Sequence, residues 1–154
     1  HEYFHGVKPI IDYVNSLGIK TLENENVYIG PKDNGFYLCG VYDRFGNRYG
    51  AYKPDINKAL ENTNTHPTVL LAHQPKFIEE IENTVGIDLI LCGHTHGGQI
   101  FPFNFLVKLQ QPYVRGLNTH NEFTQVYVNK GTGFWGPPMR LGASSEITFL
   151  KLSS

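Results

Sequence analysis

The first third of the chain combines one helical apolar pattern with several short extended runs. Between residues 7 and 17, apolar side chains recur at the spacing of a helix face, and Gly18 follows as a plausible C-cap: the apolar positions are Ile10, Ile11, Val14 and Leu17. The pattern therefore predicts a helix over this range. Short extended candidates follow at residues 19–22, 27–29 and 36–41. Asn34-Gly35 separates the last two and is typical of a hairpin turn.

The middle of the chain has the pattern of a strand–helix–strand unit. Residues 68–72 form an apolar run, and residues 87–92 form another that is apolar apart from Asp88. Between them, residues 76–85 place apolar side chains at helical spacing, namely Phe77, Ile78 and Ile81. Nearly continuous apolar strands indicate a sheet that is covered on both faces. We therefore expect parallel strands and an α/β fold.

The remaining segments are predicted from shorter signals. Asp55 can cap a short helix. Residues 100–112 are apolar and irregular, whereas residues 123–129 have the composition of a strand. After a turn rich in glycine and proline, residues 146–152 alternate between polar and apolar side chains, which predicts a final strand.

Composition indicates one globular domain and excludes some classes of protein. The 154 residues are 40% hydrophobic and 18% charged, with a net charge of −1, so nothing favours nucleic acid as a partner. No apolar run approaches the roughly 20 residues of a membrane helix. Cys39 and Cys92 lie in apolar runs and are expected to be buried free thiols. The chain begins with His1 rather than Met, so we expect a processing boundary there, with any targeting segment before it.

Histidines follow both strands of the predicted central unit. His73 comes after the first strand, and His94 and His96 come after the second, in a loop with glycines on either side. Because ligands gather at the carboxyl ends of parallel strands, these three imidazoles are expected to converge on a metal. Imidazole favours Zn, Fe, Ni, Mn or Co over Ca. The other histidines, His5, His66 and His120, are interpreted as structural or loop residues, and the lone arginines Arg44 and Arg140 as surface charges.

The histidine motifs resemble those of the calcineurin-like metallophosphoesterases. The resemblance rests on Ala72-His73 and on Gly93-His94-Thr95-His96, followed by Gly97-Gly98-Gln99-Ile100. The longer string is similar to a membrane-associated bacterial branch that includes UDP-diacylglucosamine pyrophosphatases. The closing segments, residues 126–131 and 137–148, also resemble that branch. The resemblance covers essentially the whole chain.

The resemblance implies a fold and roles for individual residues. The fold would be a metallophosphatase-type α/β/β/α sandwich, with residues 1–154 as the C-terminal portion of a single domain that lacks its N-terminal strands. His1-Glu2 resembles the end of the family's third motif, so His1 would be the catalytic imidazole. His96 would bind the first metal, while His73 and His94 would bind the second. The family's earlier metal ligands have no counterpart in this sequence.

The implied activity is hydrolysis of a phosphomonoester, a phosphodiester or a pyrophosphate. In the complete site, two divalent transition metals (Mn, Fe, Zn, Ni or Co) would share a bridging hydroxide. We expect one metal at most in this chain alone, no activity without the N-terminal half of the domain, and a phosphate-ester substrate. The alternative is a metal-binding or scaffold domain without catalysis, since half of the ligands are absent.

The apolar segment after the histidine loop has two interpretations. Residues 100–107 are more apolar than an exposed loop should be. They could form a groove for an acyl chain or touch a membrane surface, or they could pack in the core. By resemblance, the substrate would be lipid-linked and the protein membrane-associated.

Overall fold

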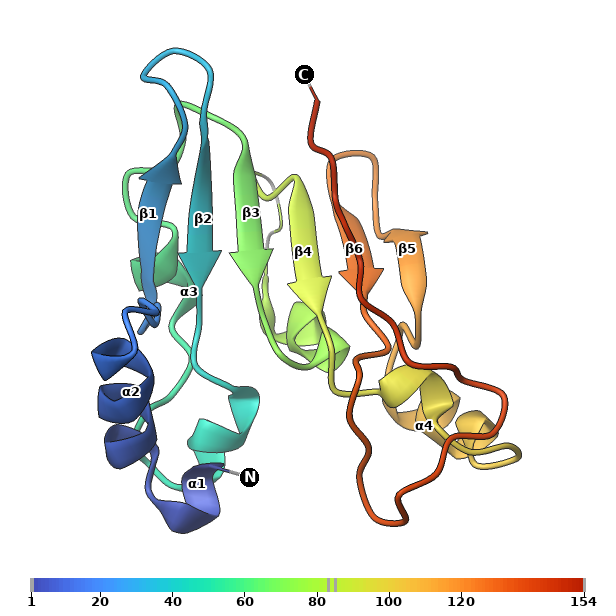
Figure 1. Cartoon of the computed structure of the whole chain (residues 1–154). Helices are drawn as coiled ribbons and strands as arrows, with labels where there is room; N and C mark the ends of the chain where they lie inside the picture. Colours follow the sequence, from blue (N-terminus) through green and yellow to red (C-terminus); the bar gives the residue numbers. More distant parts are fainter. Residues whose placement is uncertain (1, 83, 85, 154) are drawn as a thin grey trace.

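A six-stranded sheet with the order β1-β2-β3-β4-β6-β5 forms the centre of the molecule (Figure 1). The computed structural model describes residues 2–82, 84 and 86–153. Strands β2, β3, β4 and β6 run parallel, while β1 and β5 are antiparallel to their neighbours. The strands are β1 (Glu25–Ile29), β2 (Phe36–Gly40), β3 (Thr68–Leu71), β4 (Leu89–Cys92), β5 (Gly116–Thr119) and β6 (Gln125–Val128).

The helices are short and several gather at the carboxyl ends of the parallel strands, together with the loops that follow β2, β3 and β4 (Figure 1). The α-helices are α1 (Glu2–His5), α2 (Val7–Ser16), α3 (Ile56–Ala59) and α4 (Asn104–Gln110). The 3₁₀ helices are η1 (Arg44–Arg48), η2 (Pro75–Glu80) and η3 (His96–Gly98). A six-stranded mixed sheet flanked by helices is consistent with a metallophosphoesterase-type α/β fold, as the sequence predicts.

One face of the sheet carries the core. Cys39, Leu70, Ile90 and Val126 are register partners across four strands, and each is at most 2% exposed. The other side of this layer comes from Ala59 of α3, from Phe77 and Ile78 of η2, and from Ile81 directly after η2. The two cysteines are free and buried, and burial raises their pKa to about 11 for Cys39 and about 12 for Cys92, so both are protonated thiols.

The opposite face of the sheet is only partly covered. Leu71 and Leu91 are neighbours on this face, and Leu71 is 37% exposed. The chain segment after residue 145 runs along β6 on the same face (Figure 1). It is held by side chains, because Tyr127 and Asn129 bond the Glu146 carboxylate and the Thr148 hydroxyl. Ile147 and Phe149 point away and are about nine-tenths exposed, at 89% and 90%. We name residues 146–152 the tail.

Most of the predicted elements are present. The helix over residues 7–17 is α2, and Gly18 adopts a left-handed backbone with φ +81° after it. The hairpin at Asn34-Gly35 joins β1 to β2, and Asp55 caps α3 by accepting a bond from the Lys58 N–H. The strand–helix–strand unit is also confirmed, since β3 and β4 are parallel.

Five predictions of local structure need correction. Residues 19–22 form no strand, and the tail forms none either because its backbone has no ladder partner among the described residues. The predicted helix over 76–85 is the 3₁₀ helix η2, which ends when Ile81 turns extended and enters the core; Val85 lies outside the described residues. The irregular stretch 100–112 contains α4, and polar β5 was not predicted. No helix in the described part of the chain is long and apolar enough to span a membrane.

Candidate metal site at the carboxyl ends of the parallel strands

A cavity of about 630 Å³ lies where β2, β3 and β4 end. Three of its lining residues are the predicted metal ligands His73, His94 and His96. Asp43, which follows β2, lines the same cavity. Because parallel strands end at one edge of the sheet, residues that are far apart in the sequence meet here. The three histidines that the sequence predicts as ligands therefore line one cavity.

His73 and His94 form a close pair. Backbone pairing continues one step beyond β3 and β4, since the Gly93 N–H donates to the His73 carbonyl oxygen at 3.0 Å. The two imidazole rings consequently lie with their centroids 5.1 Å apart, at an interplanar angle of 74°. Both side chains remain accessible from the cavity. Two imidazoles in this arrangement can serve one transition-metal ion.

The loop that follows β4 has an unusual backbone conformation. His94, His96 and Gln99 all have positive φ, at +66°, +51° and +46°. Residues with a side chain rarely adopt this left-handed region, and such strain concentrates at functional sites. The loop therefore holds its two histidines in directions that a relaxed turn would not give them.

Buried polar side chains hold this strained loop in place. Thr95 is 4% exposed and donates its hydroxyl to the Val114 carbonyl oxygen at 2.7 Å. Gln99 is 3% exposed and pairs twice with the Trp135 backbone, donating to its oxygen and accepting from its N–H, each at 2.8 Å. Both residues belong to the sequence motif of residues 93–100. Their roles are structural, since each joins the loop to a segment distant in sequence.

His96 lies in the same cavity but faces a cation. Its Nδ1 atom is 3.3 Å from an Nη of Arg140, and a guanidinium can only donate. Nδ1 therefore accepts, and the ring proton lies on Nε2. Histidines that bind metals usually donate their second N–H to a carboxylate or carbonyl, which is the opposite polarity. In this arrangement His96 is not prepared to bind a metal through Nε2.

Arg140 has a structural role and is not the surface charge expected from the sequence. Its guanidinium donates to the backbone oxygens of His96, Lys130, Gly133 and Ala143. The side chain thereby joins the histidine loop to the segment between residues 130 and 143. A single side chain that satisfies four carbonyl groups fixes this wall of the cavity.

Asp43 is the functional candidate that the sequence did not reveal. One carboxylate oxygen accepts bonds from the Phe45 N–H at 2.7 Å and the Gln74 side chain at 2.8 Å. The other oxygen, Oδ2, is buried and has no hydrogen-bond partner in the described part of the chain. Asp43 lies just beyond β2, as His73 and His94 lie beyond β3 and β4. That shared position was the available signal for this residue.

The electrostatic surroundings favour neutral imidazoles. The pKa of His94 lies below its ordinary value, chiefly because surrounding protein displaces water from part of the ring and secondly because His73 is beside it. The pKa of His96 is also lowered, first by burial and then by the Arg140 charge. Both rings are therefore unprotonated at neutral pH, which is the form that binds metals.

The other predicted residues have separate locations. His1, the predicted catalytic imidazole, lies outside the described residues, whereas its neighbour Glu2 lines the cavity. His66 contacts the Tyr28 ring and His120 lies 3.0 Å from the Tyr113 hydroxyl. These two contacts agree with structural roles.

The residues fit one side of a metal site in their chemistry but do not complete it. Neutral imidazoles and a carboxylate oxygen without a partner are suitable donors for a divalent transition metal. Within residues 2–82, 84 and 86–153, however, no group of three or more potential ligands is close enough to hold an ion. The described part of the chain therefore provides the pair His73 and His94, with further donors required.

Relatives of this chain occur in bacteria and animals. An uncharacterized metallophosphoesterase of Helicobacter pylori is 50% identical over 153 residues, which is 99% of this chain and 40% of the relative. A Bos taurus protein named transmembrane protein with metallophosphoesterase domain is 42% identical over 165 residues, covering 100% of this chain and 37% of the relative. An uncharacterized metallophosphoesterase of Aquifex aeolicus is 33% identical over 99% of this chain and 58% of the relative.

The chain thus spans about two fifths of the length of the first two of these relatives. No family model and no solved structure matches it. Its similarity nevertheless extends over nearly all of its residues in each case. Homologues that are named metallophosphoesterases, from bacteria to animals, therefore support the metallophosphoesterase family for this chain.

Proposed function

We propose that this chain is the C-terminal part of a metal-dependent phosphoesterase domain that hydrolyses a phosphomonoester, phosphodiester or pyrophosphate. The observation that carries the proposal is the pairing of His73 and His94 in a cavity that Asp43 also lines, at the edge of the sheet where ligands gather. The names of the relatives give the same general activity. Other residues of a longer polypeptide would supply the missing donors.

Each residue has a stated role in this proposal. His73 and His94 would hold one of two divalent transition metals, and His96 would hold the other once its bond with Arg140 is exchanged. Bound metals would supply positive charge to the phosphoryl group and a nucleophile at neutral pH. His1 would donate a proton to the leaving oxygen. Asp43 would orient the His73 side of the cavity through its bond with Gln74.

Activity should depend on chain length. We expect the longer polypeptide to bind two transition metals and to hydrolyse a generic aryl phosphate, and to lose hydrolysis in excess chelator and regain it with Mn²⁺. The 154-residue chain alone should bind one metal at most and show no hydrolysis. Metal content per chain and product absorbance measure both quantities.

The same experiment distinguishes the alternative, a metal-binding or scaffold domain without catalysis. The lack of a group of three close ligands in the described residues favours that alternative for the isolated chain. Stoichiometric metal without hydrolysis in either length would establish the binding module. A monomeric, cooperatively folded 154-residue chain with two metals would contradict the fragment interpretation.

Helix α4 and the turn before it support a lipid-linked substrate and contact with a membrane surface. Core packing does not account for these residues, since α4 has no buried residue. Phe103, Phe105, Leu106 and Leu109 are between 55% and 82% exposed. Such an apolar surface is typical of an interaction site. The name of the Bos taurus relative also places a metallophosphoesterase domain in a transmembrane protein.

Replacing both Phe103 and Phe105 with serine should weaken sedimentation with phospholipid vesicles at least tenfold. The physical reason is the loss of two exposed aromatic rings that the membrane interface would bury. Metal content should be unchanged, because neither residue lines the histidine cavity. The matched control replaces Phe123, an exposed ring (57%) on the loop before β6, with serine. Vesicle binding that is equal in the double variant and the control would refute membrane contact.

A further inference from the structure

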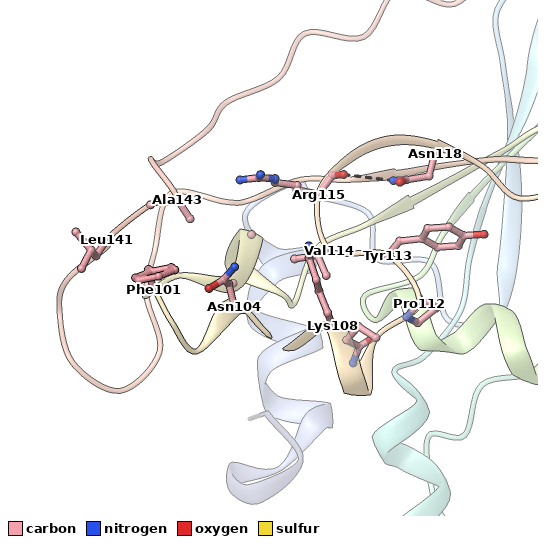
Figure 2. Close-up of a pocket in the computed structure, with 14 residues that line it drawn as sticks. Phe101, Asn104, Lys108, Pro112, Tyr113, Val114, Arg115, Asn118, Leu141 and Ala143 are labelled. Carbon is pink, nitrogen blue, oxygen red and sulfur yellow. Dashed lines mark hydrogen bonds between the residues drawn. The ribbon is translucent and has the colours of Figure 1, made fainter. Parts of the chain in front are cut away.

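A second cavity of about 580 Å³ adjoins the histidine loop (Figure 2). Gly97 and Gly98, the two residues after His96, form part of its wall, and Gln111 lines both cavities. Its other walls come from α4, from the segment that leads to β5, and from residues 141–143. Its volume lies within the range of small-molecule sites, roughly 300–1,000 Å³. None of the predicted metal ligands lines it.

Two cations without partners line this second cavity. Lys108 comes from α4, and Arg115 immediately precedes β5. In the part of the chain that the structure describes, neither side chain forms an ion pair or a hydrogen bond. The lining contains no aspartate or glutamate. Two unpaired cations facing a concave wall without acids favour an anionic ligand.

Asn104 adds a fixed polar group to the second cavity. Its Oδ1 atom is buried and has no hydrogen-bond partner among the described residues. The residue cannot move away easily, because it lies so close to Gly98 that a Cβ there would be 2.5 Å from its own Cβ. A buried acceptor without a donor is unfavourable, because it has lost its hydrogen bonds to water. A ligand hydroxyl that donates to Oδ1 would remove this cost.

Most of the remaining lining is apolar. Its polar members, Gln111 and Asn118, bond to backbone groups of the protein. Figure 2 shows the Phe101 ring and Leu141 on one side of the Asn104 amide, and the Arg115 side chain extending over the same space. Pro112, Val114 and Ala143 also belong to the apolar lining. A ligand that matches these walls therefore has an anionic group, a hydroxyl group and a carbon skeleton.

We propose that the second cavity binds a phosphate group carried on a hydroxylated carbon skeleton, separately from the histidine cavity. A phosphate monoester carries a charge of about −1.5 to −2 at neutral pH, which matches Lys108 and Arg115. The planar guanidinium group of Arg115 can donate two parallel hydrogen bonds to two phosphate oxygens. The ligand could be free, as in sn-glycerol 3-phosphate, or the headgroup of a phospholipid. The proposal does not depend on hydrolysis at the histidine cavity.

Calorimetric titration of the protein with sn-glycerol 3-phosphate, in chelator so that no metal competes for phosphate, tests the proposal. Saturable binding at one site is expected, with no binding of glycerol and weaker binding of inorganic phosphate. Replacing Lys108 and Arg115 together with glutamine should weaken binding at least tenfold, while Asn104→Leu should remove the preference over inorganic phosphate. Replacing Lys32 and Lys151, two exposed lysines away from the cavity, is the matched control and should change nothing.

Two further measurements identify the source of the ligand and distinguish the second cavity from the histidine cavity. Vesicles of phosphatidylglycerol that bind the protein, and release it when sn-glycerol 3-phosphate is added, identify a lipid headgroup; binding of the soluble ligand alone identifies a free metabolite. His94→Gly should leave this binding intact even where it removes hydrolysis. Absence of saturable binding of the soluble ligand and of the vesicles would overturn the proposal. Equal affinity in the Lys108/Arg115 variant, or loss of binding in His94→Gly, would also overturn it.

Discussion

Replacing His94 with glycine should lower metal-dependent hydrolysis by the longer polypeptide by roughly three orders of magnitude. His94 and His73 form the one close imidazole pair in the described cavity, so removing either leaves a single ring. Glycine is the informative replacement, because His94 has φ +66° and glycine adopts that conformation without strain. The loss would then report the imidazole and not the backbone. Steady-state kcat/KM with an aryl phosphate measures it.

His73→Ala provides the partner experiment, since His73 does not have positive φ. If the two rings serve one metal, each single variant should lose about as much activity as the double variant, because groups that act as a unit are not additive. His66→Ala is the control, a histidine that packs on Tyr28 away from the cavity. Activity within tenfold of the parent in both single variants would rule out this pair as metal ligands.

Gly98→Ala should lower the free energy of unfolding by about 3 kcal/mol or more. Gly98 has φ +88°, which costs a residue with a side chain about 1–2 kcal/mol. An added Cβ would also lie 2.5 Å from the Asn104 Cβ and 2.8 Å from its Cα, and the backbone must shift to relieve that overlap. Urea unfolding followed by circular dichroism measures the change.

Two other glycines separate these contributions. Gly116 has φ +70° with nothing within 4 Å of an added Cβ, so Gly116→Ala should show the cost of the backbone conformation alone. Gly133 also has open space and no positive φ, so its replacement should be nearly neutral. A loss in Gly98→Ala no larger than that in Gly116→Ala would show that contact with Asn104 does not constrain the loop.

Periodicity predicted the elements whose stability comes from burial. The predicted strands before His73 and His94 are nearly continuous apolar runs, and their order along the chain was sufficient to place both histidines at one edge of the sheet. Periodicity failed where backbone pairing or packing decides the structure. β5 has a polar sequence and exists because it pairs with β6.

The site was predictable in part for the same reason. His73 and His94 follow strands with strong signals, whereas Asp43 follows β2 after two intervening residues in a segment with the composition of a loop. The contact between Arg140 and His96 could not be predicted, because the two residues are 44 positions apart in the sequence. Contacts of that kind leave no periodic trace in a sequence.

The tail has a consequence for hydrogen exchange. Side-chain bonds to Glu146 and Thr148 hold it against β6, while its backbone from residue 147 to 152 makes no amide hydrogen bond in the described structure. Exchange of an amide proton with solvent requires only that its own hydrogen bond open. The amides of residues 147–152 are therefore free to exchange while β6 keeps its ladder intact, and these two neighbouring segments respond to solvent on separate timescales.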